Sequence, residues 1–438
     1  MSFFEKCRQT TVIVEQGSGV LFQPMIESYS YILTAKHNLY NDSVFGSYLD
    51  PKNLNELNIV FYDGVVLDIE LEENVLAKFE HQSLDIAIIR IKKRDFITSF
   101  RNNNNINNSD EFKFYGFSGY KRTYPNLNDR ISYFDLIVGD QIIPNKEIIV
   151  RNTEQFRQED ISGCSGGGVF KEFNNDFLLI GIECRMDAFS TNERSNLRLR
   201  FITIDAFDEI IAENKEELVP LYPPYMGSFD LLVENIFLLN EYEEKRNFVR
   251  RRLQYLTKTY SKDLTPIAIK QEFEDELLIN GFDINNITDN ELWQMYLEFI
   301  LLSLIIGSKE NMTIDKIKEI YKKRKILFAK ADRWVELKED ILKSNLFGLE
   351  KKGTVFIACN GNRRPNKVDL CNSIINISEP PHAEEMRIDK GIDYSVDLKY
   401  KHIYAIEQLL LDNESKFATA NNNNIDKILK EVLQNVCQ

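Results

Sequence analysis

The sequence has few cysteines and few histidines, and no long apolar run. Six cysteines are scattered over 438 residues, without a CxxC spacing or a pairing pattern. This argues against a disulfide framework and a zinc site, and it favours reduced thiols. The longest apolar stretch, Phe299–Ile306, is far too short to span a bilayer, and the first residues lack the apolar core of a signal peptide. A cytoplasmic protein without membrane contact is expected.

The sequence also has no excess of basic residues, since 68 aspartates and glutamates outnumber 54 lysines and arginines. The formal net charge is −14, which argues against a nonspecific nucleic-acid surface or an anionic membrane as the main partner. With 43% hydrophobic residues, the chain is long enough to bury at least two separate cores. A multidomain protein that does not bind nucleic acid through a general basic surface is therefore predicted.

Glycine is concentrated around one serine, Ser165, in the stretch Asp160–Phe170. Glycines allow a tight turn, in which the backbone N–H groups of Gly163 and Ser165 can point at one spot and bind an oxyanion. A serine hydroxyl is a poor nucleophile until a base takes its proton. The stretch is either a nucleophile loop or a flexible turn between strands, and the first interpretation needs a base and an acid elsewhere.

Both groups occur upstream of the serine. Ser30–His37 is a short apolar strand that ends in a histidine, and Ser83–Ile91 places Asp85 at the start of a β-branched strand. A histidine can carry the serine proton while an aspartate orients its ring. His81, four residues before Asp85, is predicted to be a surface loop residue, because His37 has the better strand context.

These motifs resemble those of trypsin/chymotrypsin-like serine peptidases. Thr34–His37 is similar to the family's Thr-Ala-Ala-His segment, Asp85–Ile88 to Asp-Ile-Ala-Leu, Gly163–Gly167 to Gly-Asp-Ser-Gly-Gly, and Gly17–Phe22 to the opening strand of intracellular and bacterial members. The resemblance covers roughly residues 8–210. It implies an all-β double six-stranded barrel with the reaction in the groove between barrels. It assigns catalysis to His37, Asp85 and Ser165, and the oxyanion hole to Gly163 and Ser165.

The resemblance says less about substrate specificity. Glu159 stands where basic-specific relatives carry an acid, which implies cleavage after Arg or Lys, unless Glu159 is an exposed loop charge. The segment Gly181–Met186 matches the one that binds the substrate backbone as an added strand, so Cys184 and Met186 are expected to contact substrate. No metal and no other cofactor is expected.

Cys164 departs from the family pattern. Secreted members carry an aspartate here that pairs with a newly cut N-terminal amine during activation. That activation route is not expected in this chain. We therefore hypothesise that a partner or another domain orders the loop around Ser165 or uncovers the groove.

The composition changes after the predicted barrels. Pro220–Tyr225 is the clearest linker. The predicted domains are a peptidase domain at 1–212, a linker at 213–228, a helical domain at 229–330 and a small α/β sensor or interaction domain at 331–438. Apolar periodicity predicts helices at Leu231–Leu239, Glu244–Leu256, Ile267–Leu278, Glu291–Ile306 and Ile314–Leu327, with Thr288 as an N-cap and Gly307 as a stop.

The last hundred residues alternate between helix and strand patterns. Trp334–Leu346 is predicted to be a helix and Gly353–Cys359 a buried strand. The run Lys322–Lys325 is interpreted as a solvated face, and it is also the best candidate in the chain for a local contact with an anion. Asn360–Arg364 lacks phosphate-loop spacing and is interpreted as a surface turn, and His382 with its neighbouring glutamates lacks the HExxH spacing of a metal site.

A peptidase joined to such a tail resembles bacterial conflict systems of the ABC-three-component type. This implies a regulated defence effector that cleaves cellular proteins once its C-terminal region, or an activating protein partner encoded nearby, is triggered. Two alternatives stay open. One is an unregulated cytoplasmic quality-control peptidase, and the other is a catalytically silent binding scaffold.

Overall fold

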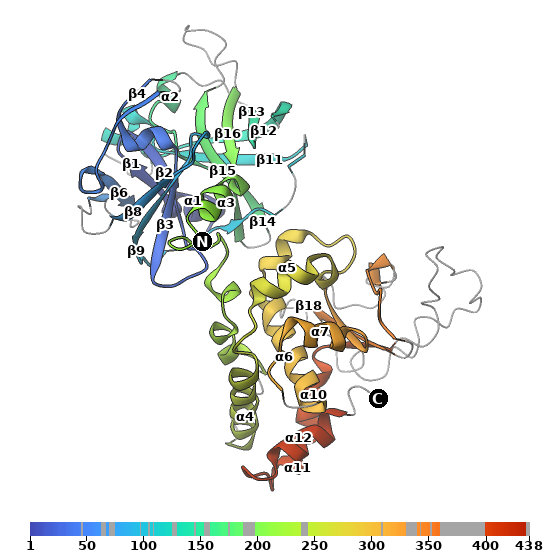
Figure 1. Ribbon diagram of the computed structural model, residues 1–438. Coiled ribbons are helices and arrows are strands. Elements are labelled where there is room, and N and C mark those ends of the chain that lie inside the picture. Colours follow the sequence, from blue (N-terminus) through green and yellow to red (C-terminus); the bar gives the residue numbers. More distant parts are fainter. Residues whose placement is uncertain are drawn as a thin grey trace, which may run out of the picture. The chain divides into compact units, whose positions relative to one another are not determined.

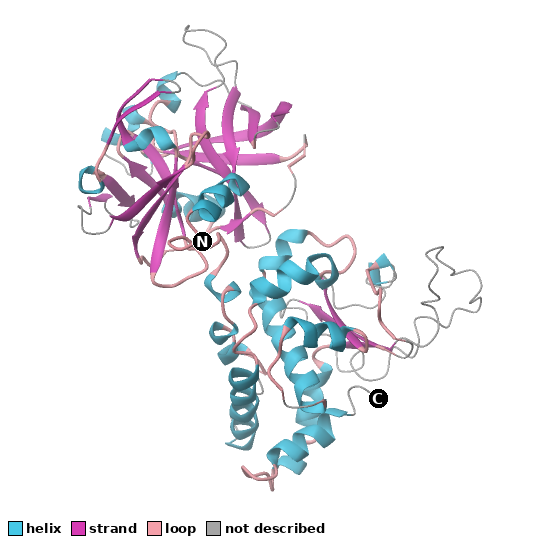
Figure 2. Cartoon of the chain, in the orientation of Figure 1, coloured by secondary structure: helices cyan, strands magenta, loops and turns pink. Residues whose placement is uncertain are grey.

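The chain forms two compact units, Met1–Pro224 and Tyr225–Gln438. Strands dominate the first unit and helices the second (Figure 2). The division falls inside the proline-rich stretch Pro220–Tyr225, and the finer four-part division stays a prediction. The computed structural model describes residues 1–44, 47–62, 67–69, 75–96, 98–103, 106–107, 109–124, 129–143, 146–152, 158–173, 176–186, 198–237, 244–307, 310–329, 340–341, 343–350, 353–359 and 399–434.

The first unit begins with a helix and a seven-stranded antiparallel sheet (Figure 1). Helix α1 is capped by Ser2, whose side chain accepts a hydrogen bond from the Glu5 backbone N–H. The strand order is β7-β6-β1-β2-β3-β9-β8, and β4 and β5 form a separate hairpin. The bounds are α1 Phe3–Thr10, β1 Thr11–Val14, β2 Gly17–Phe22, β3 Tyr29–Thr34, β4 Tyr40–Val44, β5 Ser47–Pro51, β6 Ile59–Tyr62, β7 Leu67–Ile69, β8 Val75–Glu80 and β9 Ala87–Lys92.

The second sheet closes on itself. Its order is β10-β15-β14-β11-β12-β13-β16, and β15 also pairs with β16, so six strands form a ring and β10 lies outside it, parallel to β15. The helix that follows, α3, spans Phe207–Glu213. The strands and the short helix α2 are β10 Phe100–Arg101, β11 Glu111–Gly116, β12 Ser132–Ile143, β13 Glu147–Asn152, α2 Gln158–Ile161, β14 Gly168–Phe173, β15 Asp176–Met186 and β16 Arg198–Thr203.

Alternating side chains on these strands build the cores. On β1, Val12 packs into one apolar cluster and Ile13 into another on the opposite face of the sheet. The cluster that contains Ile13 also includes Leu33 of the first sheet, Phe170 of the second and Phe207 of α3. This shared core holds the two sheets and α3 together as one unit.

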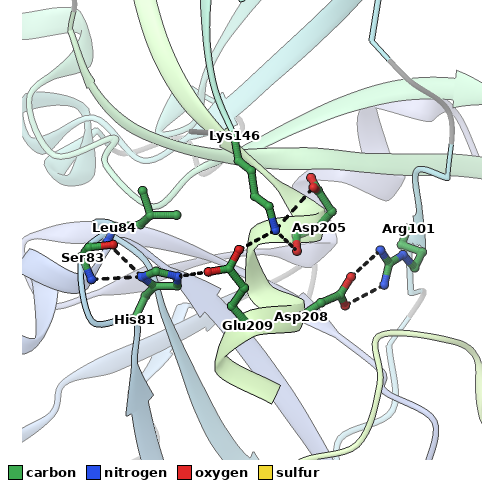
Figure 3. A network of polar contacts seen from close by, with 8 residues as sticks. All are labelled: His81, Ser83, Leu84, Arg101, Lys146, Asp205, Asp208 and Glu209. Atoms are coloured by element: carbon green, nitrogen blue, oxygen red, sulfur yellow. Dashed lines mark hydrogen bonds and ion pairs between the residues drawn. The ribbon is translucent and has the colours of Figure 1, made fainter. Parts of the chain in front are cut away.

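Helix α3 also ties the two sheets together through charge. Its Glu209 binds His81 of the first sheet's loop and Lys146 of the β12–β13 turn, at 3.0 and 2.8 Å (Figure 3). The residue before it, Asp208, accepts two hydrogen bonds from the guanidinium of Arg101, at 2.8 and 2.9 Å. The Arg101 side chain is only 8% exposed, so its charge depends on this carboxylate.

The second unit packs helices around a small parallel sheet, in the order β17-β18-β19. β17 pairs in parallel with β18, and β18 pairs in parallel with β19. With this unit, the predicted fold class is confirmed: two β-sheets, one closed into a six-stranded barrel and one a half-barrel, are followed by helices and a small α/β region. The bounds are α4 Glu244–Tyr260, α5 Pro266–Leu277, α6 Asn290–Ile306, α7 Ile314–Tyr321, β17 Arg324–Ala329, β18 Thr354–Cys359, β19 Lys399–His402, α10 Ala405–Asp412, α11 Glu414–Phe417 and α12 Ile425–Leu433.

Several predicted details of the second unit are wrong. The predicted helix Ile314–Leu327 ends at Tyr321, and the chain continues as β17, because pairing with β18 outweighs the helical pattern. Lys325 is therefore buried and paired with Glu276 at 2.6 Å, and does not lie on a solvated face.

Two helix starts also differ from the prediction. The described part of Leu231–Leu239 contains two short 3₁₀ turns, Phe229–Leu231 and Val233–Asn235, in place of a helix. Helix α6 is capped by Asp289, whose side chain accepts a hydrogen bond from the Glu291 N–H, and not by Thr288. Gly307 ends that helix as predicted.

The Arg101–Asp208 pair generates a stability prediction. Asp208→Asn removes the charge opposite a buried guanidinium, and we expect it to destabilise the chain by about 1–3 kcal/mol. Asp135→Asn is the matched control, since Asp135 pairs with Lys113 at the surface, where both side chains are about half exposed, and should cost less than about 0.5 kcal/mol. Urea unfolding of the full chain measures both, and equal effects would contradict the assigned role of the buried pair.

Candidate active site

His37 and Asp85 meet because the strands beside them pair. β3 and β9 are antiparallel neighbours, with Thr34 opposite Ala87. His37 follows the end of β3, in the 3₁₀ turn Lys36–Leu39, and Asp85 precedes the start of β9. In an antiparallel pair these two points lie at the same edge of the sheet. The structure thus brings together the two residues that the sequence predicted.

Two hydrogen bonds fix the carboxylate against the histidine. The His37 backbone N–H donates to Asp85 Oδ1 at 2.9 Å, and His37 Nδ1 lies 2.7 Å from Asp85 Oδ2. Nδ1 therefore carries a proton, which leaves Nε2 as the basic nitrogen. Burial acts to raise the pKa of Asp85, but the hydrogen bonds and charge of His37, with a hydrogen bond from Tyr48, outweigh it and hold the pKa below its usual value.

Ser165 lies on the turn between α2 and β14. Hydrogen bonds from the first sheet hold its carbonyl: the Ser18 N–H donates at 2.7 Å and the Asn38 side-chain amide at 2.8 Å. Asn38 is the neighbour of His37 in the chain. The structure therefore places the serine loop against the turn that carries the histidine.

The peptide groups before Gly163 and Ser165 are also fixed. Gly119 N–H donates to the Ser162 carbonyl at 2.7 Å, and Gly167 N–H donates to the Cys164 carbonyl at 2.8 Å. Because a trans peptide is planar, anchoring each carbonyl sets the opposite direction for the N–H of the next residue. These are the two N–H groups predicted to form the oxyanion hole, and that role stays a prediction.

Arg122 holds the loop from a second direction. Its guanidinium donates to the carbonyl of Gly163 at 3.0 Å, and Ser18 Oγ donates to the same oxygen at 3.1 Å. The same guanidinium also donates to four other carbonyls, those of Glu15, Gln16, Gly17 and Phe117. It thereby joins the β1–β2 turn to the serine loop. No sequence pattern marks this residue, since a lone arginine in a 3₁₀ turn carries no motif.

Cys164 is fully buried, and its thiol donates to the Asp160 carbonyl at 3.6 Å. Burial raises the pKa of this thiol, so it stays protonated. The loop is ordered by hydrogen bonds from within the first unit. The part of our hypothesis in which a partner orders this loop therefore has no support in the structure, whereas a partner that covers the groove is compatible with it.

The prediction that His81 is a surface loop residue is wrong. The residue is buried, at 6% exposure, and is not a surface residue. Its Nδ1 accepts hydrogen bonds from the N–H groups of Ser83 and Leu84, and its Nε2 lies against Glu209 (Figure 3). His81 therefore stabilises the turn that positions Asp85. A histidine at the start of an Asp-containing turn can act as a local cap, and sequence spacing alone does not show this.

The structure shows only the backbone of the predicted substrate contacts. Glu159 lies in α2, and Cys184 and Met186 lie on β15, but the side chains of all three are outside the described part. Their role in substrate binding stays a prediction. Asn360–Arg364 and the His382 region are also outside the described residues.

The structure adds a charged residue that the sequence analysis missed. Glu183 lies on β15, 1% exposed, and its backbone pairs with the loop: Gly166 N–H donates to the Glu183 carbonyl at 2.7 Å, and Glu183 N–H donates to the Gly167 carbonyl at 2.9 Å. Burial, and then the negative charge of Asp85, raise the pKa of Glu183 to about 8, while a hydrogen bond with the Ser165 side chain acts to lower it. A single acid within the apolar strand Phe177–Cys184 was the available signal.

Gly166 provides a test of the loop geometry. Its φ is +93°, and a Cβ at this position would lie 2.0 Å from the Ser18 carbonyl oxygen. Gly166→Ala should therefore destabilise the chain by more than about 3 kcal/mol, from strain and collision together. Gly281→Ala is the control: its φ is +76° with no atom within 4 Å, so it should cost only about 1–2 kcal/mol. Chemical unfolding that gives the same loss for both would contradict the close approach of the loop to β2.

Glu183 predicts a pH dependence of stability. Its folded pKa of about 8 lies above the ordinary 4.5, so the folded chain holds a proton that the unfolded chain releases between these values. Stability from this group is complete below pH 4.5 and is lost as the pH rises through 8. Relative to wild type, Glu183→Gln should gain stability on the order of 1 kcal/mol per pH unit across this window. Urea unfolding at pH 5, 6.5 and 8 measures the difference, and a constant difference would overturn the assignment.

Two solved structures show similarity to part of the chain. A structure titled "Kallikrein-related peptidase 10" shares 12% identity over 48% of this chain and 97% of its own length, with a TM-score of 0.34. A scabies mite inactivated protease paralogue shares 11% identity over 48% of this chain and 96% of its own, with a TM-score of 0.35. No curated protein sequence matches the chain.

The C-terminal half has its own match. Residues 201–411, from β16 into α10, match the family model described as C-terminal domain 4 of the ABC-three component (ABC-3C) systems. The resemblance expected from the order of the domains is confirmed for this region. This part of the chain is thus similar to C-terminal domain 4 of ABC-three component systems.

Proposed function

We propose that the first unit is a serine endopeptidase with His37, Asp85 and Ser165 as its catalytic residues. The observation that carries the proposal is the joint placement of the three. Asp85 holds both the backbone and the ring of His37, and the next residue, Asn38, holds the Ser165 carbonyl at 2.8 Å. These contacts join the acid, the base and the backbone of the serine loop, which supports the proposal that the three residues act together in serine acylation.

The chemistry follows from the proton positions. His37 Nε2 takes the proton of the Ser165 hydroxyl while Oγ attacks the substrate carbonyl, and the imidazolium then donates that proton to the leaving amine. The ionised Asp85 stabilises the positive ring and keeps Nδ1 protonated. The N–H groups of Gly163 and Ser165 bind the oxyanion of the tetrahedral intermediate. Water then releases the acyl group by the same steps.

The second unit supports a regulated role in a conflict system. Its similarity to an ABC-three component C-terminal domain favours a chain that works with other components, whose activating protein is encoded nearby. Because the serine loop is held from within the first unit, control is expected at the groove or at substrate delivery. Triggering would then expose a formed site and release cleavage of cellular proteins. Nothing in the described residues favours the quality-control or scaffold alternatives.

Active-site labelling tests the proposal. A fluorophosphonate probe should label the wild-type chain and fail to label Ser165→Ala, and His37→Ala should lower the labelling rate on the order of 10⁴-fold. Ser162→Ala is the matched control, an exposed serine three residues away, and it should label like wild type. The probe is applied with and without the products of neighbouring genes, and a survey of new protein N-termini under both conditions measures cleavage. Equal labelling of Ser165→Ala and wild type would contradict the assigned nucleophile.

A further inference from the structure

A buried carboxyl group lies beside the proposed nucleophile. Glu183 is 1% exposed, and the Ser165 side chain forms a hydrogen bond with its carboxyl group. Neither carboxyl oxygen has a further hydrogen-bond partner within the described residues. Buried acids usually have several partners, because an incompletely bonded carboxyl group costs free energy. A change in the charge of Glu183 therefore acts most directly on the hydroxyl of Ser165.

The backbone of Glu183 is fixed on both sides. Towards the serine loop, Gly166 N–H donates to the Glu183 carbonyl at 2.7 Å, and Glu183 N–H donates to the Gly167 carbonyl at 2.9 Å. On the other side, Glu183 lies opposite Phe201 of β16. The side chain starts from a fixed point in a packed interior, which leaves it little room to turn away. The contact between Glu183 and Ser165 is thus a constant feature of the folded barrel.

The titratable groups around Glu183 keep it protonated at neutral pH. The carboxylate of Asp85 disfavours a second negative charge, and with burial it raises the pKa of Glu183 to about 8. Cys164, in the serine loop, is a buried thiol whose own pKa is raised by burial and by Glu183, so it stays protonated. Asp85 itself is paired with the ring of His37 at 2.7 Å. Two acids in one site therefore have opposite charge states.

The charge state of Glu183 determines how it bonds the serine. A protonated carboxyl group can donate a hydrogen bond, whereas an ionised one only accepts. The hydroxyl of Ser165 has one proton, which the proposed mechanism requires to face His37 Nε2. Protonated Glu183 can donate to Ser165 Oγ and leave that proton for His37. Ionised Glu183 instead accepts the proton in a charge-assisted hydrogen bond and competes with His37.

We propose that Glu183 is a positioning residue that leaves the Ser165 hydroxyl available to His37 only while Glu183 is protonated, so that the nucleophile loses activity in alkaline solution. The inference rests on the proposed peptidase function and adds to it a control within the same site. Loss of one proton from Glu183 to the solvent turns one hydroxyl group. No step in this control requires a partner or a movement of the backbone.

The pH dependence of labelling tests the proposal. The labelling rate with a fluorophosphonate is measured at pH 7.5 and 9.5, under conditions that label the wild-type chain. The wild-type rate should fall at least about 10-fold between these values. Glu183→Gln has the same shape but cannot ionise, so its rate should change by less than about 3-fold. Asp176→Asn, at the exposed start of the same strand, should keep the wild-type fall. No fall in wild type, or an equal fall in Glu183→Gln, overturns the proposal.

A stability measurement separates this inference from the proposed function. The stability gained through Glu183→Gln increases with pH until the folded chain also loses the proton, and then levels off. Ser165→Ala removes the hydroxyl that lowers the pKa of Glu183. Urea unfolding between pH 6 and 10 should therefore show that the gain levels off at a pH higher by roughly 0.5 unit or more in the Ser165→Ala background.

The two measurements fail in different ways. Absence of labelling at every pH contradicts the proposed nucleophile, while a shifted titration would still support the contact between Glu183 and Ser165. An unshifted titration overturns that contact, even where Ser165 is labelled. The unfolding curves also confirm that each variant is folded.

Discussion

The antiparallel register between β3 and β9 is the constraint on which the site depends. It sets Thr34 opposite Ala87 and so brings the residue beyond one strand against the residue before the other. A shift of one position would turn every side chain of the strand to the opposite face and separate His37 from Asp85. The apolar residues that fix this register, such as Ile32 and Leu33, are fully buried on opposite faces of the sheet. Core packing and the contact between His37 and Asp85 therefore have the same cause.

The conformation of the serine loop depends on the same sheet indirectly, through hydrogen bonds to the loop backbone. Its backbone is bonded to Ser18 of β2, to Asn38 after β3 and to the guanidinium of Arg122. These groups come from both halves of the first unit. The loop can therefore adopt this conformation only when the two sheets pack together correctly. Helix α3 adds a second connection, since Glu209 bridges His81 and Lys146 (Figure 3). These hydrogen bonds and ion pairs therefore restrain a glycine-rich loop that would otherwise be flexible.

Sequence motifs predicted His37, Asp85 and Ser165 and the all-β architecture, because these features depend on local patterns that recur at short spacing. Groups whose role arises from long-range contacts were not predictable. Arg122, Glu183 and the buried state of His81 depend on partners up to 128 positions away. Strand β17 was read as helix, since its apolar residues fit both periods and only its pairing with β18 decides. The capping residue of α6 was missed by one position, because neighbouring threonine and aspartate are both good caps.

The hydrogen bonds that hold the Ser165 loop also affect when this loop can fold during translation. The described groups that hold the Ser165 loop, among them Ser18, Asn38 and Arg122, precede residue 225, so these contacts can form once the first unit has left the ribosome. The second unit, Tyr225–Gln438, then needs roughly 10–40 s at translation rates of about 5–20 residues per second. A restraint located in the second unit would arrive after the site is complete. Under the proposed function, the nascent chain would therefore carry a folded Ser165 loop for a short time before the second unit is complete.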